Sequence, residues 1–276
     1  MPSRPRHVRR PRLFIAAGTL AVAALGLLAA APAASAQSTV SYVALGDSYS
    51  SGVGAGNYTS SSGSCDQSPN AYPQLWANAN APASFVNETC SGATTSSVIS
   101  SQLGALNSGT SLVSITVGGN DVGFSSVMET CVLESTSSCV SAVDNSESEV
   151  ATQLPGELNS VLGDIKADAP SARVVVLDYP QLYDLSKSSS CIGLSTTDRT
   201  ALNQGASELD SAVQAAAARY GDVFADVQSQ FAGHQICDSS SWLHSVNFLD
   251  IDESYHPTAS GQSGGYLPVF TAAAKG

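Results

Sequence analysis

The sequence predicts an α/β protein with a three-layer α/β/α arrangement, in which helices cover both faces of a five-stranded parallel sheet of flavodoxin-like type. Two observations carry this prediction. Apolar runs of strand length alternate along the chain with longer segments of helical character. The runs RVVVL and LVSITV are also continuous and rich in β-branched residues, which is typical of strands buried on both faces.

The predicted elements follow one another in a regular order. We expect strands at 41–45, 84–90, 112–118, 172–180 and 222–227, and helices at 71–79, 93–107, 148–169, 197–221 and 260–275. In the helix at 197–221, Leu202, Leu209 and Val213 share one face, and Gly221 ends the helix as a C-cap. Pro155 should begin or kink a helix, because proline cannot donate the interior hydrogen bond.

The first 36 residues have the pattern of a secretory signal peptide. A basic start and a short apolar run lead directly to the small residues Ala34–Ser35–Ala36, so we expect cleavage after Ala36. A membrane anchor is the alternative, but its apolar run would be longer and would not lead into a cleavage site. We therefore expect an extracellular protein without a stable membrane anchor, whose residues 37–276 form a single domain.

The chain without this segment is strongly acidic. It loses five arginines and no acidic residue, and keeps 6 basic against 23 acidic side chains, a formal net charge of −17. Such a surface repels nucleic acid and anionic membranes, so we expect no nucleic-acid partner.

Six cysteines in a secreted chain predict three disulfides. Pairing in chain order closes the shortest loops and is favoured: Cys65–Cys90, Cys131–Cys139 and Cys191–Cys237. A zinc site is disfavoured because the cysteines show no CxxC or clustered Cys/His spacing. Serine-rich segments at 59–64, 135–141, 186–190 and 238–241 each lie next to a cysteine, and we expect them to be surface loops held by the disulfides.

Ser48 stands directly after the first predicted strand, where parallel sheets bind their ligands. A serine nucleophile needs a base in contact and hydrogen-bond donors for the oxyanion that it creates. His256 in SYHP is the candidate base, and Gly92 and Asn120 follow the second and third strands as candidate donors. Each has an ordinary structural interpretation, as a turn or a helix start, and we interpret His234 and His244 as surface histidines.

Together, and in this order along the chain, these residues form a pattern that is specific to one family. GDS with Ser48, Gly92, GGND with Asn120 and SYHP with His256 resemble, in chain order, the four motifs of the SGNH, or GDSL, hydrolase family. The chain is most similar to the secreted actinomycete esterases, lipases and phospholipases of that family. The resemblance implies that Ser48 is the nucleophile and His256 the base. It also implies an oxyanion hole made of the N–H groups of Ser48 and Gly92 and the Asn120 amide.

The group that orients His256 stays open. The family often carries Asp three residues before the histidine, where this chain has Glu253, with Asp250 and Asp252 nearby. The resemblance favours the backbone carbonyl of Ser254 and keeps Glu253 as the alternative. We interpret Asp47 as a structural hydrogen-bond acceptor rather than a triad acid.

The predicted function is therefore hydrolysis of the acyl esters of lipids through a Ser–His acyl-enzyme, without a metal or organic cofactor. We expect a monomer acting on a lipid or a small ester. The alternatives are a carbohydrate acetyl-esterase of the same fold and a disulfide-held binding module without turnover. The segment GQSGG at 261–265 matches the G-x-S-x-G motif, but no strand precedes it and no histidine follows it, so we expect no catalytic role there.

Overall fold

The computed structural model describes residues 1–3, 11, 14, 38–187 and 191–275. The chain divides into two units, 1–36 and 37–276, and all the elements below lie in the second. The predicted signal peptide falls almost entirely outside the described residues, so it stays a prediction. No helix in the described ranges has both the length and the apolar character needed to cross a bilayer.

The sheet of the second unit has five parallel strands in the order β2-β1-β3-β4-β5, which confirms the predicted fold class. The three central strands are almost entirely buried, while the edge strand β2 alternates between exposed and half-buried positions. The strands are β1 (Ser41–Gly46), β2 (Ser84–Asn87), β3 (Leu112–Thr116), β4 (Arg173–Leu177) and β5 (Val223–Ala225). Because all five run in one direction, their carboxyl ends meet at one edge of the sheet.

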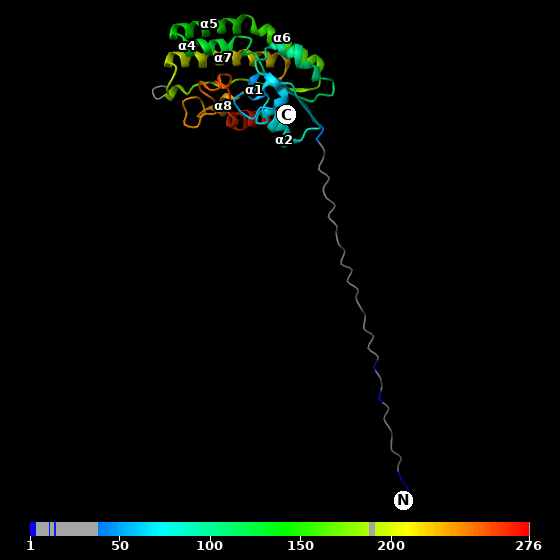
Figure 1. Cartoon of the computed structure of the whole chain (residues 1–276). Coiled ribbons are helices and arrows are strands. Elements are labelled where there is room, and N and C mark those ends of the chain that lie inside the picture. Colours follow the sequence, from blue (N-terminus) through cyan, green and yellow to red (C-terminus); the bar gives the residue numbers. More distant parts are fainter. Residues whose placement is uncertain (4–10, 12–13, 15–37, 188–190, 276) are drawn as a thin grey trace. The chain divides into compact units, whose positions relative to one another are not determined.

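Helices cover both faces of the sheet (Figure 1). One layer contains α3 (Thr95–Ser101), α4 (Phe124–Leu133), α5 (Thr136–Thr152), α6 (Leu154–Asp168) and α7 (Thr196–Tyr220). The other contains α2 (Tyr72–Asn80), α8 (Gln228–Phe231) and α9 (Leu267–Ala274). The short helix α1 (Ser48–Ser51) follows β1 directly. Gly221 ends α7 as expected: it adopts φ 70°, and its N–H donates to the carbonyls of Ala217 and Ala218.

The region between β3 and β4 differs most from the prediction. The single helix expected at 148–169 is two helices, because α5 ends at Thr152 and Pro155 stands in the first turn of α6. The prediction of a loop at 135–141 is wrong. Ser135 caps α5 by accepting a hydrogen bond from the Ser138 N–H, and the helix continues from there. Helix α4, which precedes it, was not expected at all.

Smaller differences have local causes. The helix expected at 93–107 ends at Ser101 and is followed by a 3₁₀ turn at Leu103–Ala105. The last helix begins as a π-helical turn at Gly261–Tyr266 and becomes α9, with Pro268 in its first turn. Of the expected serine-rich loops, 59–64 lies largely in a 3₁₀ helix at Ser60–Cys65, and 188–190 lies outside the described residues.

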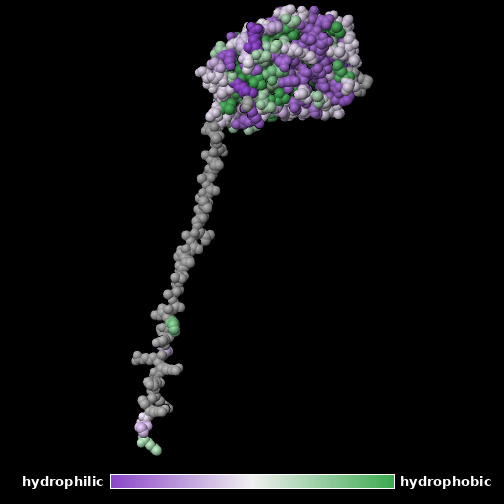
Figure 2. Space-filling model, turned by 180° about the vertical axis from the view of Figure 1, so that it is seen from behind, coloured by the Kyte–Doolittle hydropathy of each residue, from purple (hydrophilic) through white to green (hydrophobic). Residues whose placement is uncertain are grey.

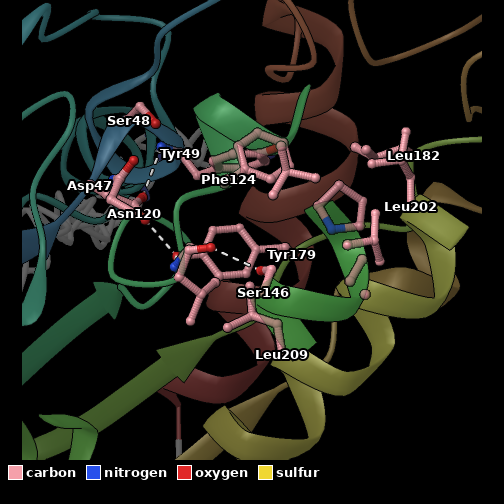
Figure 3. Close-up of a pocket in the computed structure, with 17 residues that line it drawn as sticks. Asp47, Ser48, Tyr49, Asn120, Phe124, Ser146, Tyr179, Leu182, Leu202 and Leu209 are labelled. Carbon is pink, nitrogen blue, oxygen red and sulfur yellow. Dashed lines mark hydrogen bonds between the residues drawn. The ribbon is translucent and has the colours of Figure 1, made fainter. Parts of the chain in front are cut away.

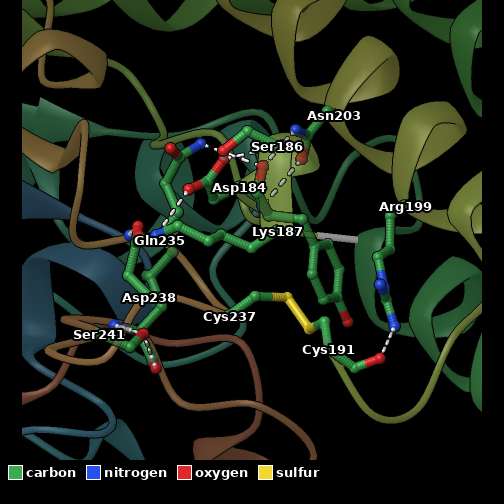
Figure 4. The surroundings of a disulfide bond; sticks show 12 residues. Asp184, Ser186, Lys187, Cys191, Arg199, Asn203, Gln235, Cys237, Asp238 and Ser241 are labelled. Atoms are coloured by element: carbon green, nitrogen blue, oxygen red, sulfur yellow. Dashed lines mark hydrogen bonds and ion pairs between the residues drawn. A yellow bond between two sulfur atoms is a disulfide. The ribbon is translucent and has the colours of Figure 1, made fainter. Parts of the chain in front are cut away.

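Three disulfides fasten the connections of the sheet, between Cys65 and Cys90, Cys131 and Cys139, and Cys191 and Cys237. The second joins α4 to α5. The third joins the connection after β4 to the connection after β5, and Figure 4 shows the Lys187–Asp238 and Arg199 contacts around it. The connections that leave the carboxyl ends of β4 and β5 are thus tied together.

The face shown in Figure 2 is a mixture of hydrophilic and hydrophobic residues. Such mixing is ordinary, because apolar atoms make up more than half of most protein surfaces. Hydropathy of the surface alone therefore does not locate a functional site, and the site is better sought at the carboxyl edge of the sheet.

Candidate active site

Ser48 is presented by a tight turn at the end of β1. Gly46 adopts φ 120°, and a Cβ there would lie 2.4 Å from the carbonyl oxygen of Thr116, so only glycine fits. Asp47 then caps α1, accepting a 3.0 Å hydrogen bond from the Tyr49 N–H. Ser48 is the first residue of that helix, where the N–H has no partner within the helix and can serve a ligand.

Asp47 holds this turn to the core of the sheet. Its side chain is 1% exposed and accepts hydrogen bonds from the Thr116 hydroxyl at 2.6 Å and the Tyr179 hydroxyl at 2.5 Å, besides the Tyr49 N–H. Burial raises the pKa of Asp47 to about 6, although these hydrogen bonds act in the opposite direction. Both carboxylate oxygens are occupied, which fits a structural acceptor.

His256 lies in direct contact with Ser48, although 208 positions separate them in the chain. The imidazole Nε2 is 2.7 Å from the Ser48 Oγ, and the Nδ1 is 3.0 Å from the Ser254 carbonyl oxygen. Because a carbonyl only accepts, the Nδ1 carries the proton and the Nε2 accepts the serine hydroxyl. Burial lowers the pKa of His256 to about 4, so the ring is neutral at pH 7.

The loop around His256 owes its shape to Tyr255. This residue adopts φ 66°, an uncommon conformation for a bulky side chain, and it turns the chain between Ser254 and His256. Its carbonyl accepts a 2.9 Å hydrogen bond from the Tyr49 hydroxyl, and its own hydroxyl accepts one from Tyr183 at 3.3 Å. Two buried tyrosines, one in α1 and one in the connection after β4, thus hold the turn that aims the ring.

Glu253 is directed elsewhere. Its carboxylate accepts a 2.6 Å hydrogen bond from the Tyr58 hydroxyl, which in turn accepts one from the Gly54 N–H at 2.9 Å. The chain from Gly54 to Tyr58 follows Ser48, so this link joins the segment after the serine to the segment before the histidine. The Ser254 carbonyl, rather than Glu253, is the group within hydrogen-bond distance of the ring.

Gly92 and Asn120 stand at the ends of the neighbouring strands. Gly92 adopts φ 73° with no atom within 4 Å of where a Cβ would be, so a ligand can approach its backbone. The Asn120 amide donates one hydrogen to the Ala93 carbonyl at 3.0 Å, which fixes the group and leaves its second hydrogen for another acceptor. Both are expected oxyanion donors, and both lie on segments that meet at the carboxyl edge.

Two supporting residues were missed in the sequence. Gln102 is buried and bonds both polar groups of Gly46, accepting from its N–H at 2.7 Å and donating to its carbonyl at 3.0 Å. Asp121 accepts from the N–H and hydroxyl of Thr95, and so joins the turn after β3 to the first turn of α3. Asp121 stood in the GGND motif, whereas Gln102 gave no signal, because only the fold brings it to Gly46.

An apolar pocket opens beside Ser48 (Figure 3). Ser48 and Asn120 lie at one end, and Leu182 and Leu202 at the other. The walls come from α4, α5, α7 and the connection after β4, and include Phe124, Val127, Val143, Leu182, Leu202 and Leu209. A pocket with this lining fits a flexible apolar chain better than a polar ring.

The other two histidines of the described residues are half-buried, whereas the sequence predicted solvent-exposed surface histidines. His234 is half-buried and stacks on Trp242, with ring centroids 3.7 Å apart. His244 is half-buried, with its Nε2 2.8 Å from the Gly54 carbonyl oxygen and its backbone bonded to Tyr255 and His256. His244 therefore supports the loop that carries the candidate base.

The remaining candidates lie away from this chemistry. Ser263 of the GQSGG segment is exposed in the π-helical turn and bonds the Ala259 carbonyl. Within the described part of the chain, no three or more His, Cys, Asp or Glu side chains gather in a way that could hold a metal ion.

Comparisons with known proteins agree on one family. Residues 44–263 match the GDSL-like lipase/acylhydrolase family. Lipase 1 of Streptomyces coelicolor is 53% identical over 95% of this chain and 96% of its own. The crystal structure of phospholipase A1 from Streptomyces albidoflavus has a TM-score of 0.83 and 54% identity, covering 85% of this chain and 99% of its own. An extracellular lipase structure from Streptomyces rimosus gives a TM-score of 0.82 at 48% identity, with the same coverage.

Proposed function

We propose, since this chain belongs to the GDSL-like lipase/acylhydrolase family, that it is a secreted lipase or esterase in which Ser48 and His256 hydrolyse carboxylic esters of lipids through an acyl-enzyme. One observation carries the assignment of these residues: the 2.7 Å contact between the Ser48 Oγ and the His256 Nε2 at the end of an apolar pocket. Neutral imidazole in contact with a serine hydroxyl is the arrangement that activates this weak nucleophile.

The first half-reaction forms the acyl-enzyme. His256 takes the proton of Ser48 at its Nε2 while the Oγ bonds to the ester carbonyl carbon, and the Ser254 carbonyl stabilises the imidazolium through its Nδ1–H. The carbonyl oxygen becomes an oxyanion facing the N–H groups of Ser48 and Gly92 and the Asn120 amide. The imidazolium then protonates the leaving alcohol as the carbon–oxygen bond breaks.

The second half-reaction returns the enzyme. His256, again neutral, removes a proton from water while the water oxygen attacks the acyl carbon of Ser48. The same donors hold the second oxyanion, and the proton returns to the Ser48 Oγ as the carboxylic acid leaves. These residues supply the nucleophile, the base and the charge stabilisation themselves, so we propose no metal or organic cofactor in the reaction.

The pocket supports a lipid acyl group as the part of the substrate that is recognised. Its lining includes three leucines, three valines and Phe124, and Asp47, Ser48 and Asn120 lie together at one end (Figure 3). A sugar acetyl-esterase would use aromatic platforms, but Trp76 is buried in the core and Trp242 is stacked on His234. A series of nitrophenyl esters of increasing acyl length should therefore favour chains longer than acetyl.

Secretion is proposed on the signal-peptide pattern of 1–36 and on the extracellular relative from Streptomyces rimosus. The mature enzyme would then be the single domain of residues 37–276, acting as a monomer. Mass spectrometry of protein from the culture medium should give an N-terminus at Gln37.

The test of the function is a comparison of the parent protein with Ser48→Ala. The parent should hydrolyse a soluble nitrophenyl ester and react covalently with a fluorophosphonate, whereas Ser48→Ala should lose at least about 10⁴-fold in kcat and resist labelling. An unlabelled, inactive parent would support the binding-module alternative. A Ser48→Ala variant with parental turnover would reject this serine as the nucleophile.

The role of Asn120 is tested separately. Asn120→Ala should lower kcat by about 10²- to 10³-fold, because one oxyanion donor is removed, while KM changes much less. Turnover at the parental rate would show that Asn120 is not an oxyanion donor.

A further inference from the structure

We infer that Phe248, Leu249 and Ile251, here called the apolar tip, dock the enzyme onto the surface of uncharged or zwitterionic lipid aggregates. The inference rests on the proposed function, since it assigns the form in which the lipid ester reaches Ser48. The three side chains are exposed by 80%, 99% and 62% in the segment that leads to His256. Three such side chains within four positions differ from the singly scattered apolar residues of ordinary surfaces.

Most of the large exposed hydrophobic side chains lie in the connections that follow β4 and β5. In the described residues from 38 onward there are seven, and three of them form the apolar tip. Leu185 and Ile192 lie in the connection after β4, which also leaves the carboxyl edge of the sheet. The Cys191–Cys237 disulfide joins this connection to the one that contains the tip (Figure 4). The other two are Val86 in β2 and Leu133 at the end of α4.

The base of the tip is fixed to the catalytic groups. Asn247 accepts from the N–H groups of Leu249 and Asp250, closing a turn that directs the tip away from its base. The Asn247 N–H donates to the Ser254 hydroxyl at 2.9 Å, and the Ser254 carbonyl is the acceptor for the His256 ring. A lipid surface bound by the tip is thereby held beside His256.

The charges near the tip select the kind of surface. Asp250, Asp252 and Glu253 alternate with its apolar residues, and the chain from residue 37 carries a net charge of −17. Anionic lipid headgroups would be repelled, whereas uncharged and zwitterionic headgroups would not. A stable protein partner is disfavoured by size, because specific interfaces use about 20 to 30 residues on each side. Shallow insertion of aromatic and aliphatic side chains at a lipid boundary needs far fewer.

The test measures binding without hydrolysis. Every protein carries Ser48→Ala, and sedimentation with phosphatidylcholine vesicles is compared for the otherwise unchanged chain, Phe248→Ser/Leu249→Ser and the matched control Leu133→Ser. The control removes an exposed leucine at the end of α4, outside the tip. The tip variant should bind at least about tenfold more weakly, because two apolar side chains no longer leave water. The control should bind as the unchanged chain does. Vesicles rich in phosphatidylserine should bind more weakly than phosphatidylcholine vesicles.

A second measurement uses the active enzyme. The tip variant should lose at least about tenfold more turnover on vesicular phosphatidylcholine than on a soluble nitrophenyl ester. Equal losses on both substrates would overturn the inference, because the loop would then act only by positioning His256. Undiminished vesicle binding by the tip variant, equal weakening by Leu133→Ser, or no binding of the unchanged chain would also overturn it. A change from dimer to monomer in light scattering would identify the tip as a protein interface instead.

The two proposals can fail separately. Loss of soluble-ester turnover in Ser48→Ala tests the catalytic assignment and does not involve the tip. If that variant keeps its turnover, the proposed function fails whatever the vesicles show. If turnover is lost but vesicle binding does not depend on Phe248 and Leu249, the function stands and the docking inference fails.

Discussion

Asp47 and Glu253 are acidic side chains near Ser48 and His256, the two residues proposed to react, and the fold uses them differently. Asp47 precedes Ser48, is almost fully buried and accepts from donors on α1, β3 and the end of β4. Glu253 precedes His256 by three positions, is half-buried and is bonded to Tyr58. The turn of the proposed nucleophile is thus held by a buried carboxylate, whereas the ring of the proposed base is oriented by a backbone carbonyl. Changes on the two sides should therefore have unequal effects.

The largest effect is expected for Asp47→Ala, which tests the role of the buried carboxylate beside Ser48. It leaves the Tyr49 N–H and the hydroxyls of Thr116 and Tyr179 without their buried acceptor and removes the cap of α1. We expect a loss of about 3 kcal/mol in unfolding free energy and of about 100-fold in kcat. Urea denaturation and soluble-ester kinetics measure both. Asp144→Ala, at an exposed position of α5, is the control. Equal denaturation midpoints for the two variants would contradict the role given to Asp47.

The pH dependence of kcat/KM should distinguish His256 from Asp47, because the two residues have different pKa values. Burial lowers the pKa of His256 to about 4 and raises that of Asp47 to about 6. Neutral imidazole is the active form, so kcat/KM on an uncharged ester should fall about tenfold per pH unit below a midpoint that lies under 6.5. A limb that disappears in Asp47→Asn belongs to Asp47, and one that remains belongs to His256. A midpoint at or above 6.5 would show that burial does not govern the base.

Glu253→Ala tests the other side of the comparison. Since the acceptor for the His256 Nδ1–H is the Ser254 backbone carbonyl, removing the carboxylate should lower kcat by less than about tenfold. Tyr58→Phe removes the same hydrogen bond from its other end and should match it. A loss on the order of several hundredfold in Glu253→Ala alone would mean that the carboxylate orients the ring.

The sequence predicted some parts of the fold and the site better than others. The parallel sheet was readable because its buried strands are continuous apolar runs, and the residues that the motifs indicate lie at strand ends, which a parallel sheet brings to one edge. The start of α5 was missed because serine and threonine dominate it, and these residues favour loops as readily as helix caps. Helix α4 was missed although six of its ten residues are apolar. The single helix expected at 148–169 failed at Gln153, where a second helix starts with Pro155 in its first turn.

Side-chain partnerships were less accessible. Gln102 looked like an ordinary helical residue, and only the folded chain shows it bonded to Gly46. The choice between Glu253 and Ser254 depends on the backbone turn at Tyr255, whose φ of 66° no propensity of tyrosine predicts. Motifs indicate which residues react, whereas the groups that hold them are set by long-range packing.

The smallest expected effect on activity comes from Asp178→Asn. This substitution tests how far the stability of the core beside the sheet depends on a buried carboxyl group. Asp178 follows β4, is 1% exposed and accepts from the Val227 N–H at 2.7 Å. Burial and the nearby Asp210 raise the pKa of Asp178 to about 9, far above its value of 3.8 in an unfolded chain. A raised acid pKa stabilises the fold at low pH, and this stability is lost as pH rises from about 4 toward 9.

Asparagine keeps an acceptor for Val227 and cannot ionise, so Asp178→Asn should remove part of that loss. We expect its unfolding free energy at pH 9 to exceed the parental value by roughly 1 kcal/mol or more, with a smaller difference at pH 5 and kcat within about twofold. Urea denaturation at the two pH values makes the measurement, with Asp144→Asn as the exposed control. If Asp178→Asn kept the parental slope of unfolding free energy against pH, Asp178 would be ionised in the folded protein over this range. The core would then tolerate its charge.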